Sequence, residues 1–136
     1  MNLPRIFQVR RPPANEAEIQ VLMAVTGTLP KMYVELLKYA NGLEACIHDK
    51  DGDCLAIWGT AEVVELNDAY MIAKWCPNLL AIGSDGGDDA IGFDRQPGRH
   101  PDDWPVVRIG FGNLDPIDYL IVAPNLQAWA ENEFRL

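Results

Sequence analysis

Apolar residues in the first forty positions recur at the spacing of helices. Asn15 is a candidate N-cap with Glu18 three residues later, a variant of the capping box, and Gly27 is a natural helix stop. The apolar positions between them share one helix face: Ile19, Leu22 and Met23. A second helix is predicted to begin at Pro30 and end at Asn41-Gly42. Its apolar stripe consists of Tyr33, Leu36, Leu37 and Ala40.

After these helices, short apolar runs separated by turn residues predict strands. Asp51-Gly52 is a hairpin-turn pair, and residues 61–75 are predicted to be mainly helical until Pro77 stops them. Strands are predicted over residues 55–58, 79–82, 90–94, 106–111 and 119–123. Because residues 119–123 are apolar throughout, we expect a central strand there. A last helix is predicted from Pro124-Asn125.

This order of elements predicts an α+β fold. Helices come first, strands follow and a helix closes the chain, so we expect a largely antiparallel sheet with the N-terminal helices on one side. With no internal repeat, residues 1–136 are interpreted as a single domain, in which residues 1–14 form a basic, extended lead-in. The pattern does not give the strand order.

Composition supports an ordinary globular domain. The 136 residues are 49% hydrophobic, and no apolar run approaches the ~20 residues of a membrane span. The N-terminus lacks the continuous apolar segment of a secretory signal. Three cysteines without a C-x-x-C pair favour a cytoplasmic protein with reduced thiols.

The charge is lopsided. The formal net charge is −9, and residues 39–136 hold six bases and seventeen acids. Such a surface repels nucleic acid and anionic membranes and favours a basic protein partner. The alternative is that the acidity serves solubility only.

Known catalytic and metal-binding patterns match poorly. The spacing of Asp49, Asp51 and Asp53 matches the first three ligands of a calcium-binding loop. However, Cys54 and Thr60 occupy the positions where that loop needs glycine and glutamate. The histidines and cysteines lack zinc spacing. We therefore assign no catalytic, metal or cofactor residues. The remaining enzyme hypothesis is a small hydrolase that uses the carboxylates of Asp85, Asp88, Asp89 and Asp94.

The tryptophans differ in their surroundings. Trp58, Trp75 and Trp129 lie in or beside apolar runs and are predicted to be core residues. Trp104 lies between prolines in a polar loop, so it is either an exposed partner anchor or packed back onto its own domain. The candidate partner-binding set is Trp104 with Asp88, Asp89, Asp102 and Asp103 around it.

Several segments, in order, resemble the SUKH superfamily (Smi/Knr-like). The strongest is Ile82–Asp94, which is similar to the hallmark Gly-Ser-Asp-Gly-Gly stretch and its following strand. The other matching segments are Leu29-Pro30, Asn41-Gly42, Ile57-Trp58-Gly59, Glu65-Leu66-Asn67, Asp115-Pro116 and 123–129. Asp88-Asp89 departs from the more usual glycine–glutamate, and the loop over residues 96–103 is long.

The resemblance implies an α+β domain without catalysis or cofactor. It implies binding to a cognate toxin domain in the bacterial cytoplasm, as an immunity protein. The acidity of the chain favours a basic toxin, such as a nuclease. The fungal members imply the alternative, an intracellular regulatory or scaffold adaptor. The partner's identity and the oligomeric state stay open.

The hallmark loop, which we define as Gly83, Ser84, Asp85, Gly86, Gly87 and Asp94, can be structural or functional. Gly86 and Gly87 permit the positive φ that a tight reversal needs. Ser84 and Asp85 can accept backbone N–H groups within the turn. A structural role is favoured over a binding role.

Overall fold

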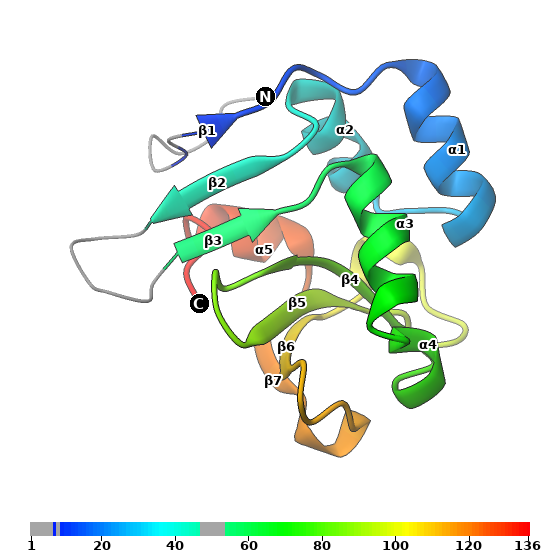
Figure 1. Cartoon of the computed structure of the whole chain (residues 1–136), viewed down its shortest axis with the longest axis vertical. Helices are drawn as coiled ribbons and strands as arrows, with labels where there is room; N and C mark the ends of the chain where they lie inside the picture. Colours follow the sequence, from blue (N-terminus) through cyan, green and yellow to red (C-terminus); the bar gives the residue numbers. More distant parts are fainter. Residues whose placement is uncertain (1–6, 8, 47–53) are drawn as a thin grey trace.

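The computed structural model describes Phe7, residues 9–46 and residues 54–136 (Figure 1). The helices are α1 (Glu16–Thr26), α2 (Lys31–Tyr39), α3 (Thr60–Ala69), α4 (Ile72–Trp75) and α5 (Leu126–Glu131), with 3-10 turns η1 (Pro101–Asp103) and η2 (Pro116–Asp118). The strands are β1 (Val9–Arg10), β2 (Leu43–Cys46), β3 (Cys54–Ile57), β4 (Leu79–Ser84), β5 (Asp89–Asp94), β6 (Val106–Gly110) and β7 (Leu120–Ala123). The predicted hairpin turn at Asp51-Gly52 lies outside the described residues.

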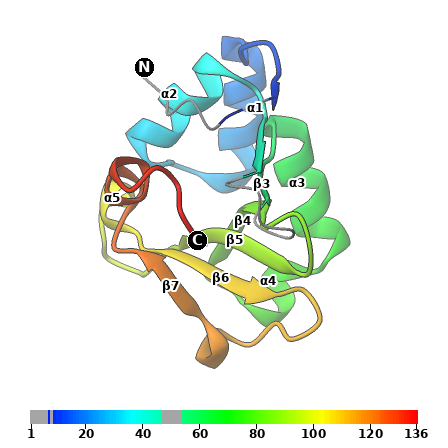
Figure 2. The ribbon, with the colours of Figure 1, turned by 90° about the vertical axis from the view of Figure 1, so that its left-hand side faces the viewer.

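The seven strands form one sheet in chain order, β1 to β7. Every neighbouring pair is antiparallel. The α+β prediction with an antiparallel sheet is therefore confirmed. Helices α3 and α4 contact β4, whereas α5 contacts α2, η1 and β7 (Figures 1 and 2).

The first two helices begin where the sequence predicts. The Asn15 side chain accepts from the Glu18 N–H at 2.8 Å, and the Glu18 carboxylate accepts from the Asn15 N–H at 3.1 Å, which completes the capping box. Gly27 ends α1 with φ 76°. Pro30 precedes α2 but cannot cap it, so the Lys31 N–H donates to Asp102 of η1 at 2.8 Å.

The predicted helix over residues 61–75 is divided in two. Helix α3 ends at Ala69, and Met71 takes a left-handed conformation with φ 54° before α4 begins. The turn places Ile72 and Cys76 in the core against β4 while Tyr70 and Met71 stay exposed. The apolar pattern is continuous here because both helices cover the sheet.

Two burial predictions are wrong. Residues 119–123 do not form a central strand: β7 is an edge of the sheet, and Leu120 and Ile121 are exposed. Trp75 is 53% exposed instead of lying in the core, whereas Trp58 and Trp129 are buried as predicted. Both errors share one cause, because an apolar run shows what a residue type prefers but not which side of the element has a neighbour.

The cysteines differ in state. Cys76 is a free thiol that is fully buried, and burial raises its pKa. Cys54 is disulfide-bonded, so the expectation of reduced thiols is wrong for this residue. The part of the chain that the structure describes contains no helix that could span a membrane.

Candidate functional site

All residues of the hallmark loop except Asp94 lie at the end of β4 or in the turn of the β4–β5 hairpin. The Asp85 Oδ1 atom accepts from the N–H groups of Gly87 at 2.9 Å and Asp89 at 3.1 Å. The Ser84 hydroxyl accepts from the Gly86 N–H at 3.2 Å. Gly86 has φ 79°, so one of the two glycines adopts the left-handed conformation that the sequence predicts. These bonds satisfy the backbone of the turn itself.

Arg108 of β6 binds both aspartates of this hairpin. Its Nη2 lies 3.0 Å from Asp85 Oδ2, and its Nε donates to Asp89 Oδ2 at 2.9 Å. The three side chains are only 16–27% exposed, which protects the pairs from solvent screening. Both carboxylates are therefore committed to holding β4, β5 and β6 together.

Two more glycines in this segment are fixed by close strand approach. A Cβ atom on Gly83 would lie 2.1 Å from the Ala56 carbonyl oxygen, and one on Gly92 would lie 2.2 Å from that of Leu80. No side chain fits at such distances. Asp94, the last residue of the hallmark loop as defined above, lies at the far end of β5. Its carboxylate accepts from the Gln96 side chain at 3.2 Å.

Asn67 of α3 bonds to β4 where the ladder becomes irregular. Strand β3 pairs with β4 only at Ser84 and Gly83, and the β4–β5 register shifts between Ala81 and Gly83. The Asn67 amide donates to the Ala81 carbonyl at 2.7 Å and accepts from the Ala81 N–H at 3.0 Å. Asn67 thus replaces a strand partner, a role that the sequence analysis missed.

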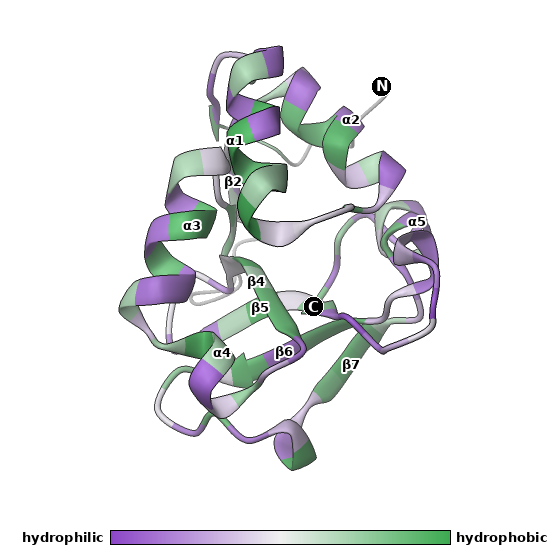
Figure 3. Ribbon diagram, turned by 90° about the vertical axis from the view of Figure 1, so that its right-hand side faces the viewer, coloured by the Kyte–Doolittle hydropathy of each residue, from purple (hydrophilic) through white to green (hydrophobic). Residues whose placement is uncertain are grey.

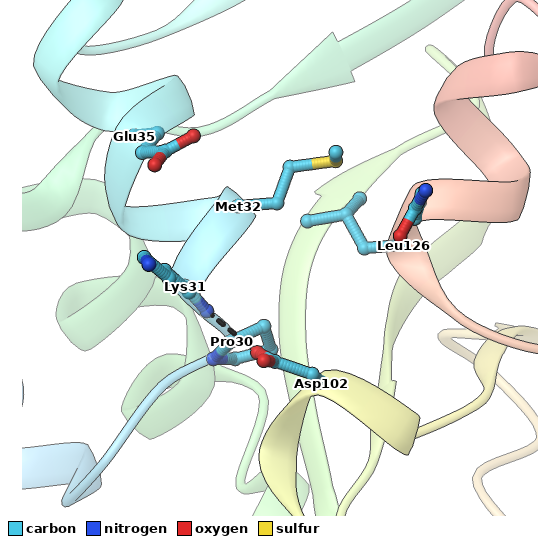
Figure 4. Close-up of a pocket in the computed structure, with 7 residues that line it drawn as sticks. Pro30, Lys31, Met32, Glu35, Asp102 and Leu126 are labelled. Atoms are coloured by element: carbon cyan, nitrogen blue, oxygen red, sulfur yellow. Dashed lines mark hydrogen bonds between the residues drawn. The ribbon is translucent and has the colours of Figure 1, made fainter.

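Asp102 and Asp103 lie far from the hairpin turn. Asp88 and Asp89 are at the start of β5, whereas η1 follows its other end, beyond six residues that span about 20 Å. Asp102 caps α2 beside an open pocket of about 260 Å³ between α2, η1 and α5 (Figure 4). The four aspartates proposed as one charged surround therefore form two separate groups.

Trp104 is buried. It is 8% exposed and packs near Phe93, with ring centroids 6.2 Å apart. Of the two alternatives for Trp104, the structure has the one in which it packs onto its own domain, and the idea of an exposed anchor is wrong. Its Nε1 has no hydrogen-bond partner among the described residues, and the same holds for the Tyr33 hydroxyl.

The exposed aromatic side chains lie elsewhere, at the α3–α4 corner. Tyr70 is stacked on Phe111 with centroids 4.3 Å apart, and Trp75 lies under the Lys74 ammonium. Tyr70, Met71 and Trp75 are all 45–53% exposed. The exposed Met71 in a left-handed turn cannot be recognised from the sequence pattern.

Within the described part of the chain, no group of three histidine, cysteine or acidic side chains could hold a metal ion. The calcium-like series Asp49, Asp51 and Asp53, together with His48, lies outside the described residues. The carboxylates proposed for a hydrolase are divided: Asp85 and Asp89 bind Arg108, and Asp94 lies at the other end of β5. Of these four aspartates, only Asp88 is classed as exposed.

Comparison with protein-family models gives a match. The model of the SMI1 / KNR4 family (SUKH-1) matches residues 13–132, which include every helix and all strands except β1. No match was found among curated proteins. The matched region contains Asn41, Asn67 and the β4–β5 hairpin, which carries the hallmark loop. Because the match spans most of the chain, this protein belongs to the SMI1 / KNR4 family (SUKH-1).

Proposed function

We propose that this chain is a non-catalytic protein-binding domain that acts as an immunity protein. It binds a cognate toxin domain of basic charge and thereby neutralises it. The observation that carries the proposal is the family match over residues 13–132. The net charge of −9 supports a basic partner, because opposite charges steer encounter.

The state of the conspicuous polar residues supports binding over catalysis. The Asp85 carboxylate accepts two backbone N–H groups and pairs with Arg108, so both of its oxygens are engaged in contacts within the fold. The same contacts support a structural role for the hallmark loop. A hydrolase that uses Asp85 is therefore the weaker hypothesis, and turnover lost in Asp85→Asn with the fold intact is what it requires.

The experiment is protection from a toxin. The genes beside this one are searched for a toxin domain, which is expressed in a host with and without the chain, and the purified pair is titrated by calorimetry. Restored growth together with a stoichiometric complex supports the proposal. If growth is not restored and no complex forms, the chain is not the immunity protein of that toxin.

Membership of this family also supports one alternative, a regulatory adaptor, which the resemblance to the fungal members implies. An adaptor copurifies with host proteins in cells that carry no toxin gene. We place the protein in the cytoplasm, where an immunity protein meets an incoming toxin, although the Cys54 disulfide favours an oxidising compartment. Alkylation of the protein in intact cells, followed by mass spectrometry, measures the state of Cys54 directly.

A further inference from the structure

Helices α1 and α3 lie side by side (Figures 1 and 3). Side chains from both helices line a groove. The groove is open and has a volume of about 470 Å³. Its lining is largely apolar and comes from both helices: Asn15, Ala17, Glu18, Val21, Leu22, Thr60, Ala61 and Val64. Val21 is 66% exposed, and Val25 one turn later is exposed to a similar degree. An open apolar groove of this kind marks a site of association.

The groove has an acidic rim. Helices α1 and α3 together contain five acids and no lysine or arginine. Three of the acids are engaged: Glu16 with Lys38, Glu18 with Asn15 and Asn41, and Glu62 with Arg11. The other two, Glu65 and Asp68, are exposed and have no partner among the described residues.

Glu65 and Asp68 are placed to face a bound partner. Each lies four residues beyond a lining residue, Glu65 after Ala61 and Asp68 after Val64, so each follows that residue on the same face of α3. A segment in the groove would therefore contact apolar side chains along its centre and carboxylates along its edge. The complementary segment has an apolar stripe flanked by basic side chains.

We propose that this groove binds an amphipathic, basic helix of the partner protein. The proposal rests on the proposed function and names the surface through which it is carried out. A helix is the occupant because the backbone of α1 and α3 is hydrogen-bonded within each helix and offers no edge to an added strand. The ten to eleven residues of these helices match a partner helix of about three turns.

The test uses the full chain, labelled with ¹⁵N, and a synthetic peptide of about 14 residues. The peptide carries leucine at helical spacing and lysine elsewhere, and a second peptide has glutamate in place of lysine. We expect the lysine peptide to shift amide resonances of α1 and α3, and the glutamate peptide to shift none. If the lysine peptide does not bind, or shifts resonances elsewhere, the proposal is overturned.

Variants locate the binding. Val21→Asn combined with Val64→Asn should raise the Kd of the lysine peptide at least about tenfold. Glu65→Gln combined with Asp68→Asn should weaken binding and flatten its salt dependence. The control is Ile117→Asn, which changes a side chain that is 84% exposed on η2, outside the groove, and should leave the Kd unchanged. Equal binding by all variants overturns the proposal.

The toxin complex separates this inference from the proposed function. If Val21→Asn with Val64→Asn binds and neutralises the toxin as well as the unchanged chain, the groove is not the interface but the function stands. If no toxin is neutralised while the peptide still binds in the groove, the function fails and the site stands. A second copy of the chain is the other possible occupant of the groove, and sedimentation of the chain alone would detect such a dimer. A dimer that the Val21→Asn and Val64→Asn changes dissociate would overturn the proposal.

Discussion

At the scale of single residues, partly buried asparagines connect elements that the backbone ladder leaves unpaired. Asn41 accepts from the Thr60 N–H at 2.7 Å and donates to Glu18 at 3.1 Å, so it joins α1 to the start of α3. Asn67 does the same between α3 and β4. Single asparagines do not follow the helical or strand periodicity of the sequence, and these partners lie 14 to 23 residues away. The sequence pattern therefore does not predict these bonds.

We expect Asn67→Ala to lower the free energy of unfolding by about 2–4 kcal/mol, because it leaves both polar groups of Ala81 without a partner. Asn113→Ala is the matched control, since the Asn113 amide makes one exposed bond to Asp118 and should cost under about 0.5 kcal/mol. Urea unfolding of the two variants measures the difference. Equal losses would mean that Asn67 does not replace a strand partner.

Tyr33 gives the opposite prediction. Its hydroxyl is fully buried without a partner among the described residues, and burial raises its pKa above the ordinary value of about 10. Tyr33→Phe should therefore raise the free energy of unfolding by about 1 kcal/mol at neutral pH. A loss of stability would show that the hydroxyl is hydrogen-bonded.

The same residue predicts a pH dependence. Since the raised pKa belongs to the folded state, the unfolded chain ionises first, and stability falls as the pH rises above about 10. Tyr33→Phe should reduce this alkaline loss, and Tyr119→Phe should reduce it as well, because burial also raises the pKa of Tyr119. Urea unfolding at pH 7 and pH 10.5 tests both variants. Parallel losses in all three proteins would contradict the assignment to Tyr33.

At the scale of elements, the hallmark hairpin depends on one glycine of its Gly-Gly pair. We expect Gly86→Ala to cost about 1–3 kcal/mol, because φ is 79° and the new Cβ would lie 2.9 Å from the Cys54 Cβ. Gly87→Ala should cost much less, since its Cβ meets only Asp85 Oδ1 at 3.5 Å. Thermal unfolding compares the two. Equal losses would contradict the turn geometry.

The sequence predicts elements well where the determinants are local. Asn15, Glu18 and Gly27 fix α1 through bonds within its own ends, and Asn125 starts α5 by accepting from the Ala128 N–H. The sequence pattern fails where contacts with residues distant in the chain determine the burial or the end of an element. Leu120 and Ile121 are apolar yet lie on the open edge of β7, and Met71 divides a continuous apolar pattern.

The candidate site shows the same division. The turn of the hallmark loop follows from its glycines and from side chains that bond within four residues. The pairing of Asp85 and Asp89 with Arg108 spans 19 to 23 positions and depends on the strand order, which the pattern does not give. Trp104 is buried beside Phe93 of β5, a neighbour that the residues around Trp104 in the sequence do not reveal.

At the scale of the whole molecule, the charge of −9 acts over distances beyond any contact. Attraction to a basic partner speeds encounter, whereas the stability of the complex depends on a few buried contacts. Asp89 and Asp102 make structural bonds, so neutralising all four of the aspartates first proposed would disturb the fold as well as the charge. Asp88 and Asp103 are exposed and can be changed safely.

Two double variants separate attraction from docking. Asp88→Asn with Asp103→Asn and Glu65→Gln with Asp68→Asn each remove two charges, so both should slow association with a basic toxin by about two- to fivefold at low salt. Only the second pair lies on α3 one turn beyond the lining residues Ala61 and Val64. Only this pair should therefore also speed dissociation, because contacts in the bound state govern that rate. Stopped-flow kinetics at low and high salt measures both rates. An association rate that does not change with salt would mean that the acidity serves solubility, and unchanged dissociation in the second variant would place the interface elsewhere.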